Sequence, residues 1–302
     1  MAISLHALHA FGDAALSPDP DLAVAALMIA RVEYPELDVN RYLAQLDFIG
    51  DEACRRLSTA EPPADTPHDV DADRYAKVTA LNAYLFDELR FVGNEADYGD
   101  PRNSFLNEVI DRRTGIPITL SLVYMEVARR AGLPVEGVNF PGHFLLRCRA
   151  GRRTRAYAED LIIDPFHGGA LLSRDLLARQ AGGDDGDENP SRLESLLPRA
   201  TKPQILSRML ANLKRVFVNM QSFPQARDIA DMLLAVDPSA IGELRDRGLL
   251  AYNLKDFSGA LRDLQDYLKL IPPGAQDDDE RQDRERIWEH VKTLRKRVAS
   301  LN

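Results

Sequence analysis

The chain has 302 residues, of which 45% are hydrophobic, so it is long enough for two domains with packed cores. Its formal net charge of −9 argues against a nucleic-acid-binding protein. The short run Arg295-Lys296-Arg297 is the one basic cluster, and a solvated helix face explains it.

The two cysteines, Cys54 and Cys148, stand far apart and form no Cys-x-x-Cys pair, which suits a reducing compartment. We expect both thiols to be buried core residues. The N-terminus lacks a basic segment followed by an apolar run of about 18 residues, so we expect neither a signal peptide nor a membrane span. These features predict a cytoplasmic protein.

Apolar residues recur with a helical period through residues 18–60. Asp19 or Asp21 can cap the first helix, which Pro35 ends, and a second helix starts near Val39. Residues 61–72 have the composition of a loop. A third helix follows, with an apolar stripe made by Val78, Leu81, Leu85 and Phe86.

Turn residues then predict an ordered loop around Gly93-Asn94 and Gly99-Asp100-Pro101. Asn103 or Ser104 can cap a short helix containing Leu106 and Val109. A longer helix opens at Gly115-Ile116-Pro117, because proline in the first turn loses no hydrogen bond there. Gly132 ends this helix.

Four short strands are predicted after the long helix, and they indicate a small antiparallel sheet packed against it. The strands are Val135–Val138, His143–Cys148, Arg155–Glu159 and Leu161–Asp164. Residues 181–190 are acidic, rich in glycine and free of large apolar residues, which indicates a loop near a domain boundary.

The C-terminal third contains an internal repeat. Phe223, Ala226, Leu234 and Pro238 recur 34 residues later as Phe257, Ala260, Leu268 and Pro272. A helix–turn–helix period of about 34 residues is typical of tetratricopeptide repeats. After an acidic stretch at 277–280, an amphipathic helix with Ile287, Trp288, Val291, Leu294 and Val298 is predicted to cap the stack.

Several motifs together resemble the bacterial SirB-type family, which joins a transglutaminase-like core to tetratricopeptide repeats. They are Arg31-Val-Glu-Tyr-Pro-Glu-Leu, Gly93-Asn94, Arg102-Asn-Ser-Phe-Leu-Asn107, Arg113-Thr-Gly-Ile-Pro-Ile, Pro141-Gly142-His143-Phe144 and Asp164-Pro165-Phe166. The resemblance spans roughly residues 20–170 and, with the repeats, reaches about residue 272. It implies an α+β fold: a mainly helical papain/transglutaminase-like core with a small antiparallel sheet, followed by an all-α helical repeat.

Enzymes of the transglutaminase-like type place a cysteine at the start of the central helix, where the helix dipole and a histidine favour the thiolate. Counting back from Gly132, the equivalent position in this chain falls near Pro117. Proline cannot act as a nucleophile. The resemblance matches His143 to the general base and Asp164 to the carboxylate that orients it. The pattern therefore predicts a degenerate catalytic triad that lacks its cysteine.

Two hypotheses follow from this pattern. In the first, the core has lost catalysis and binds a protein or peptide, with the repeats as a second surface. In the second, a hydrolase or acyl transferase uses His143 and Asp164 with the hydroxyl of Thr119 or Ser121, or with an activated water. Each of these residues also has a purely structural interpretation: Thr119 bonds to the backbone, Ser121 is a small packing residue, and His143 with Asp164 is a structural pair.

The resemblance also suggests that Asn103, Asn107, Glu108 and Phe144 line the same cleft as His143 and Asp164. We expect no metal and no cofactor, because one histidine beside Asp164 and Glu108 is too few convergent ligands. The predicted domains are residues 1–195, the transglutaminase-like domain, and 196–302, the repeat domain with its capping helix. The predicted partner is a protein or peptide, with no nucleic acid and no membrane.

Overall fold

The computed structural model describes residues 3–150, 159–180, 197–271 and 278–300 of the chain. The chain divides into two compact units. The core unit comprises residues 21–31 and 36–205, and the repeat unit comprises residues 1–20, 32–35 and 206–302. The predicted domain boundary at residue 195 falls within 181–196, outside the described residues.

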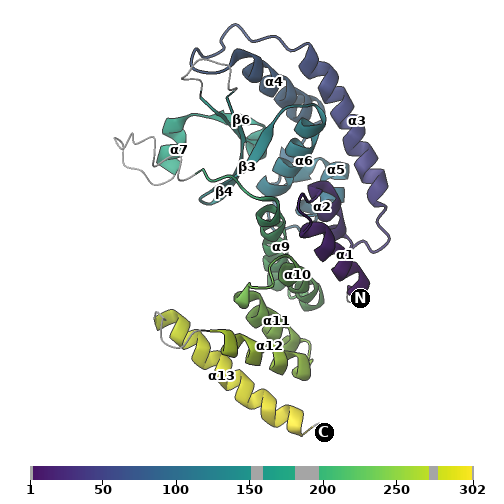
Figure 1. Ribbon diagram of the computed structural model, residues 1–302, viewed down its shortest axis with the longest axis vertical. Helices are drawn as coiled ribbons and strands as arrows, with labels where there is room; N and C mark the ends of the chain where they lie inside the picture. Colours follow the sequence, from purple (N-terminus) through teal and green to yellow (C-terminus); the bar gives the residue numbers. More distant parts are fainter. Residues whose placement is uncertain (1–2, 151–158, 181–196, 272–277, 301–302) are drawn as a thin grey trace. The chain divides into compact units, whose positions relative to one another are not determined.

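Helices form most of the core unit (Figure 1). They are α2 (Leu22–Ala30), α3 (Val39–Ser58), α4 (Ala72–Asn82), α5 (Leu106–Arg112), α6 (Pro117–Arg130) and α7 (Arg174–Gln180). Aspartates fix the starts of three of them, since the carboxylates of Asp21, Asp38 and Asp71 accept backbone N–H groups of the first turn. Helix α4 continues into a π-helical turn, η1 (Ala83–Glu88).

Helix α6 is the central helix of the core unit, and every residue from Ile118 to Ala128 is buried. Its one buried acid, Glu126, is neutralised within the same helix by Arg130 at 2.5 Å and Arg129 at 2.9 Å. Helix α3 packs closely against α6 at Gly50, where an added Cβ would lie 2.5 Å from the Arg130 Cβ. Glycine is therefore required at this crossing.

Four antiparallel strands form the sheet in the order β3-β4-β5-β6. They are β3 (Val135–Phe140), β4 (His143–Cys148), β5 (Leu161–Asp164) and β6 (Ala170–Leu172). Strands β3 and β4 make a hairpin in which Phe140 pairs with His143, and Gly142 takes the positive φ of 75° that its turn needs. The sheet is thus antiparallel, as predicted.

The two faces of the sheet pack against different helices, and Figure 1 shows the sheet lying between α6 and α7. Val138, Phe140, Leu145 and Ile162 form one cluster with Leu177 of α7 and Leu197. Side chains alternate along a strand, so Phe144, Leu146 and Cys148 point to the other face. That face meets α6, where Cys148 lies near Tyr124.

Two smaller features of the sheet region were not predicted. Strand β6 pairs with β5, so that Ile163 lies opposite Leu171, and it is three residues long. Strands β1 (Val92–Gly93) and β2 (Thr114–Gly115) form a parallel pair that ties the loop before α5 to the start of α6. Most of the predicted strand Arg155–Glu159 lies outside the described residues.

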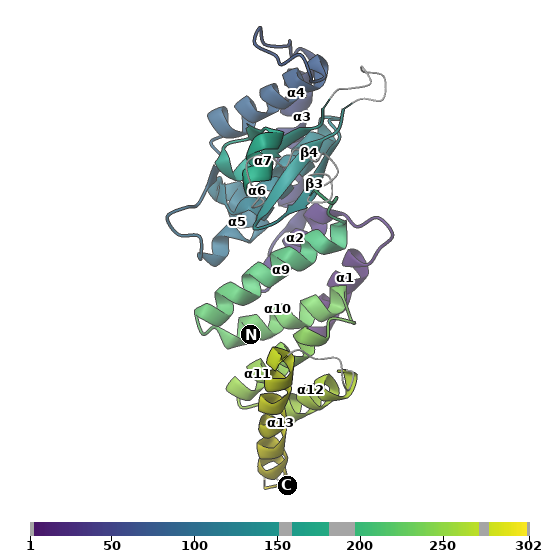
Figure 2. The same cartoon turned by 90° about the vertical axis from the view of Figure 1, so that its left-hand side faces the viewer.

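The repeat unit is built of helices, and Figure 2 shows α10 to α13 following one another in it. It contains α1 (Leu5–Ala15), most of α9 (Lys202–Asn219), α10 (Phe223–Val236), α11 (Ile241–Asn253), α12 (Phe257–Leu270) and α13 (Asp278–Ala299). The repeated residues occupy equivalent places. Phe223 and Phe257 are the first residues of α10 and α12, and Ala226 and Ala260 are fully buried one turn later.

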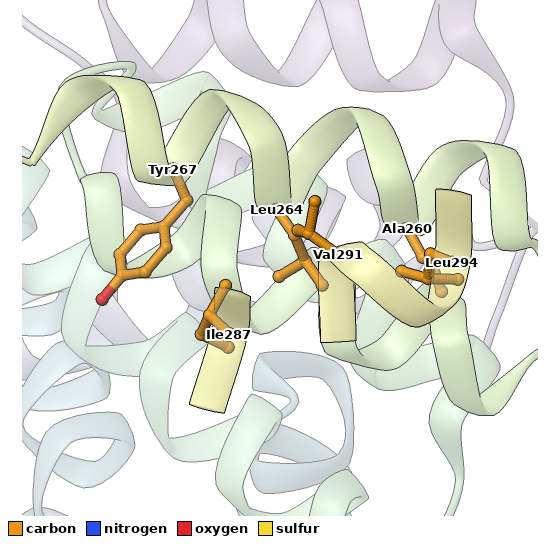
Figure 3. Close-up of a cluster of buried hydrophobic side chains, with 7 residues drawn as sticks. Ala260, Leu264, Tyr267, Ile287, Val291 and Leu294 are labelled. Carbon is orange, nitrogen blue, oxygen red and sulfur yellow. The ribbon is translucent and has the colours of Figure 1, made fainter. Parts of the chain in front are cut away.

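Helix α13 covers the last repeat, as the apolar stripe predicted. Its Ile287, Val291 and Leu294 pack against Ala260, Leu264 and Tyr267 of α12 (Figure 3). Trp288 directly follows Ile287, so its side chain points about 100° away from this stripe around the helix, and it is 44% exposed.

A partly buried charge network joins three helices of the repeat unit. The Arg247 guanidinium on α11 contacts Asp231 of α10 at 2.7 Å and both carboxylate oxygens of Asp263 on α12 at 2.6 and 2.9 Å. Asp263 is 3% exposed. Because buried charges are tolerated when they are paired, the three residues fix how α10, α11 and α12 align.

Helix α1 belongs to the repeat unit, although the sequence placed residues 1–20 with the core. Ser4 caps it, and the backbone N–H of Ile3 donates to Asp228 Oδ2 on α10 at 3.1 Å. Phe11 and Ala15 are buried, and Gly12 approaches Ala235. The mainly helical α+β unit with a small sheet, joined to an all-α repeat, confirms the predicted fold class.

Candidate functional site

The start of helix α6 is where a transglutaminase-like enzyme would present its nucleophile. Pro117 is the first helical residue and Ile116 is the N-cap. Thr119 is fully buried, and its Oγ1 donates to the carbonyl of Asn103 at 2.7 Å. The same oxygen accepts the N–H of Ile116 at 3.1 Å. The Thr119 hydroxyl is thus committed to holding the backbone at this helix start.

Ser121 and Tyr124 lie further along the same helix, and both hydroxyls are buried. Neither has a hydrogen-bond partner among the described residues. Burial raises the pKa of Tyr124 well above its ordinary value, and its ring stacks on Phe86 at 6.2 Å. Ser121 therefore occupies the place of a small packing residue.

His143 begins β4 on the sheet face that α6 does not cover. It pairs with Phe140, its ring lies 6.4 Å from the Phe140 ring, and Phe140 belongs to the cluster with Leu177. Within the described part of the chain, no hydrogen bond or ion pair joins the His143 imidazole to another residue. By strand alternation His143 faces the side of the sheet that carries the Leu177 cluster, whereas Thr119 and Ser121 belong to α6, which packs on the other side.

Asp164 ends β5 and caps the short turn η3 (Pro165–His167). Its Oδ1 accepts the backbone N–H groups of Phe166 at 3.0 Å and His167 at 3.4 Å. Its Oδ2 lies 2.7 Å from His167 Nδ1. The Asp164 side chain is 9% exposed and the His167 side chain 51% exposed, so the pair opens to solvent on the histidine side.

The histidine beside Asp164 is thus His167, which the sequence reasoning missed. His143 shares the sheet face of Asp164 by strand alternation, yet the described contacts of Asp164 go to η3. The signal was present in Asp164-Pro165-Phe166-His167, because an aspartate that caps a turn lies next to the residue three positions later.

The residues expected to line a cleft are mostly enclosed. Asn103 is fully buried, with Oδ1 accepting from Asn94 and Nδ2 donating to the carbonyl of Asp97 at 2.8 Å. Asn107 is buried, and its Oδ1 has no partner among the described residues. Glu108 is half-buried. Phe144 is buried beneath Gly137, where an added Cβ would lie 2.6 Å from its ring.

The two cysteines differ in their exposure to solvent. Burial raises the pKa of the Cys148 thiol, which lies 3.8 Å from Arg74 Nη1. Cys54 is exposed, so the prediction that it is a core residue was wrong. The buried stripe of α3 runs through Ala53 and Leu57, and Cys54 lies one position off it.

The core unit also contains a cavity of about 270 Å³ at the end of the sheet away from His143. Arg147, Asp160, Ile162 and Leu177 are among the side chains that line it. Arg147 is neutralised by Glu136, with Nη2 at 2.7 Å. Over the described residues, no cluster of three or more metal-ligating side chains occurs.

The repeat unit exposes several large apolar side chains on its helices. Val218 and Met220 lie at the end of α9, Leu270 at the end of α12, and Trp288 on α13. Grooves of about 690 and 760 Å³ lie on either side of Trp288. Of the four, Trp288 lines both grooves, and tryptophan is enriched among the residues that carry binding energy at protein interfaces. None of the helices in the described parts of the chain combines the length and the apolar composition of a membrane-spanning segment.

Comparison with known proteins supports both units. Residues 40–211 match the model of the transglutaminase-like superfamily, and residues 213–292 match that of the tetratricopeptide repeat. A UPF0162 protein of Xylella fastidiosa is 41% identical over 254 residues, covering 83% of this chain and 84% of that protein.

Two further similarities are more partial. Human F-box only protein 21 is 31% identical over 261 residues, which are 79% of this chain and 40% of that protein. The solved structure of menin with its binding site for the Mixed Lineage Leukemia protein has a TM-score of 0.44 at 11% identity. It covers 87% of this chain and 68% of menin. The family match over more than half of the chain shows that this protein belongs to the transglutaminase-like superfamily, with tetratricopeptide repeats after its core.

Proposed function

We propose that this protein is a binding or regulatory module whose transglutaminase-like core does not catalyse acyl transfer and whose repeats bind a protein or peptide. The observation that carries the proposal is the start of α6. No cysteine stands there, and the Thr119 hydroxyl is bonded to Asn103 and Ile116. The SirB-type designation and a cytoplasmic location, with neither nucleic acid nor membrane as partner, belong to the same proposal.

The repeat unit supports the binding half of the proposal. Stacked helical repeats offer extended surfaces that are used for protein recognition. In this chain Val218 and Met220 are exposed at the end of α9, and Leu270 is exposed at the end of α12. A core cleft formed by Asn103, Asn107, Glu108 and Phe144 stays a prediction, because these side chains are largely buried.

Affinity capture from a bacterial extract tests the proposal. The full chain is compared with a variant in which Val218, Met220 and Leu270 are all changed to Ser. Phe48→Ser is the matched control, because Phe48 on α3 of the core unit is 73% exposed. We expect the triple variant to lose the captured proteins and Phe48→Ser to retain them. Equal capture by all three proteins would contradict the proposal.

The second candidate function is a hydrolase or acyl transferase in which a histidine and Asp164 activate Thr119, Ser121 or a water. The observation that favours it is the pair of Asp164 with His167, because a carboxylate on Nδ1 leaves Nε2 to act as a base. Amide or ester hydrolysis by the full chain tests it. Activity that is lost in His167→Ala or His143→Ala would favour this function over the first. Its loss in Thr119→Ala or Ser121→Ala would then assign a hydroxyl nucleophile, and its retention in both would assign an activated water.

A further inference from the structure

The groove between α12 and α13 has a charge opposite to that of the chain as a whole. Lys269, Arg281, Arg284 and Arg295 line it, against one acidic residue, Glu285. The whole chain has a net charge of −9. We refer to this space of about 760 Å³ as the basic groove. A local excess of positive charge on an acidic protein attracts an acidic ligand to that place.

Trp288 forms one wall of the basic groove and makes no part of the apolar stripe that packs on α12. Figure 3 shows that stripe, with Ile287, Val291 and Leu294 directed at α12. The Arg295 guanidinium lies 5.7 Å from the centre of the Trp288 ring, and Lys292 lies 5.9 Å away. An exposed tryptophan among basic side chains is a common anchor residue of protein interfaces.

Two of the basic residues that line the groove, Lys269 and Arg295, stay exposed although they have contacts. Lys269 contacts Asp266 at 2.8 Å, and this pair is exposed. The Arg295 Nε and Nη2 atoms lie 3.0 Å from the side-chain amide of Gln265, which is uncharged. Arg295 is therefore held in place by a neutral group, and its charge stays available to a ligand.

We infer that the basic groove binds an acidic segment of a partner protein, with carboxylates on Arg284 and Arg295 and an apolar side chain on Trp288 and Leu268. The inference rests on the proposed function and names the chemistry of the partner. A peptide fits better than a nucleic acid for two reasons. The groove is one short patch, and a long polyanion would meet the acidic remainder of the chain.

Fluorescence anisotropy with the full chain tests this inference. The probe is a short labelled peptide of alternating glutamates around a central leucine. A second peptide has glutamine in place of every glutamate, and a third has serine in place of the leucine. We expect the first peptide to bind most tightly, with an affinity that falls as salt is raised.

Three variants locate the site. Trp288→Ala and Arg284→Glu should each weaken binding by at least about tenfold, the effect of losing an anchor residue. Lys296→Glu is the matched control, since Lys296 is exposed on the same helix outside the groove and the charge change is identical. It should retain binding to within about twofold of the unchanged chain.

Two results would overturn the inference. One is an equal loss of peptide affinity in Lys296→Glu and Arg284→Glu, and the other is an equal affinity for the glutamate and glutamine peptides. Tighter binding of a short single-stranded RNA, with the same dependence on Arg284 and Trp288, would make the groove a nucleic-acid site instead. If the peptide fails to bind while extract capture still depends on Val218, Met220 and Leu270, the inference fails and the proposed function stands.

Discussion

At the scale of single residues, the hydroxyls of α6 distinguish a structural role from a catalytic one. Thr119→Val removes the hydrogen bonds to Asn103 and Ile116 and leaves buried backbone groups unpaired, so it should cost about 1–3 kcal/mol of stability. Ser121→Ala removes a buried hydroxyl without a partner among the described residues, so it should be neutral or stabilising by about 1 kcal/mol. Urea unfolding of both variants checks this, and a strongly destabilised Ser121→Ala would contradict it.

Asp228 gives the repeat unit a pH-dependent stability. It is 4% exposed, and burial, with Asp231 nearby, raises its pKa from 3.8 to about 6. The folded chain therefore binds more protons than the unfolded chain between about pH 4 and 6, so this residue lowers stability as pH rises through that range.

Asp228→Asn should consequently stabilise the protein at pH 7, by about 1–3 kcal/mol, with the gain vanishing near pH 4. The carboxamide oxygen can still accept the N–H of Ile3. Urea unfolding at the two pH values measures the difference. Asp266→Asn, the same change at an exposed position of α12, is the control and should have little effect. A loss of stability in Asp228→Asn at pH 7 would show that the charge is needed.

The two thiols should react differently. Cys54 is exposed, and Cys148 is buried with a raised pKa, which lowers the thiolate fraction. Titration of the native chain with an aromatic disulfide reagent should modify one thiol, and unfolding in urea should expose the second. Loss of the native reaction in Cys54→Ser assigns it. Two reactive thiols in the native chain would contradict the burial of Cys148.

At the scale of elements, Arg247 connects α11 to both neighbouring helices. Arg247→Ala removes the partner of Asp231 and leaves the buried Asp263 with only the exposed Arg262, at 3.2 Å, so it should cost up to about 3–5 kcal/mol. Lys269→Ala breaks the exposed pair with Asp266 and should cost less than about 1 kcal/mol. Changing Arg247, Asp231 and Asp263 together to Ala should recover part of the loss. A small effect of Arg247→Ala alone would contradict the role of this network.

The sequence predicted elements whose signals are local. The 34-residue period placed α10 and α12, and Pro117 with Gly132 bounded α6. Features that depend on distant partners were missed. Helix α1 buries Phe11 and Ala15 against α10, more than 200 residues away, and this contact leaves no local pattern. Strand β6 is three residues long and is defined by its pairing with β5.

The same limit applied to the candidate site. The motifs identified His143 and Asp164 as functional candidates, but the direction of each side chain depends on sheet register and on the turn after β5. The hairpin at Gly142 sets His143 beside Phe140, and the turn η3 brings His167 to Asp164. The hydrophobic periodicity of one sequence reveals neither the register of the sheet nor the course of the turn after β5.

At the scale of the whole molecule, the proposed function is binding of a partner without turnover. A binding module and a hydrolase or acyl transferase both bind their partner first, so capture alone does not distinguish the two functions. Removal of a catalytic histidine separates them, because an inactive enzyme retains substrate that the active enzyme converts and releases.

The most direct measurement is therefore quantitative capture from the same extract by the full chain and by a His143→Ala, His167→Ala double variant. The account predicts the same proteins in the same amounts on both. Proteins that accumulate on the double variant and are absent or cleaved on the unchanged chain would identify substrates, and would contradict the proposal that the core has lost catalysis.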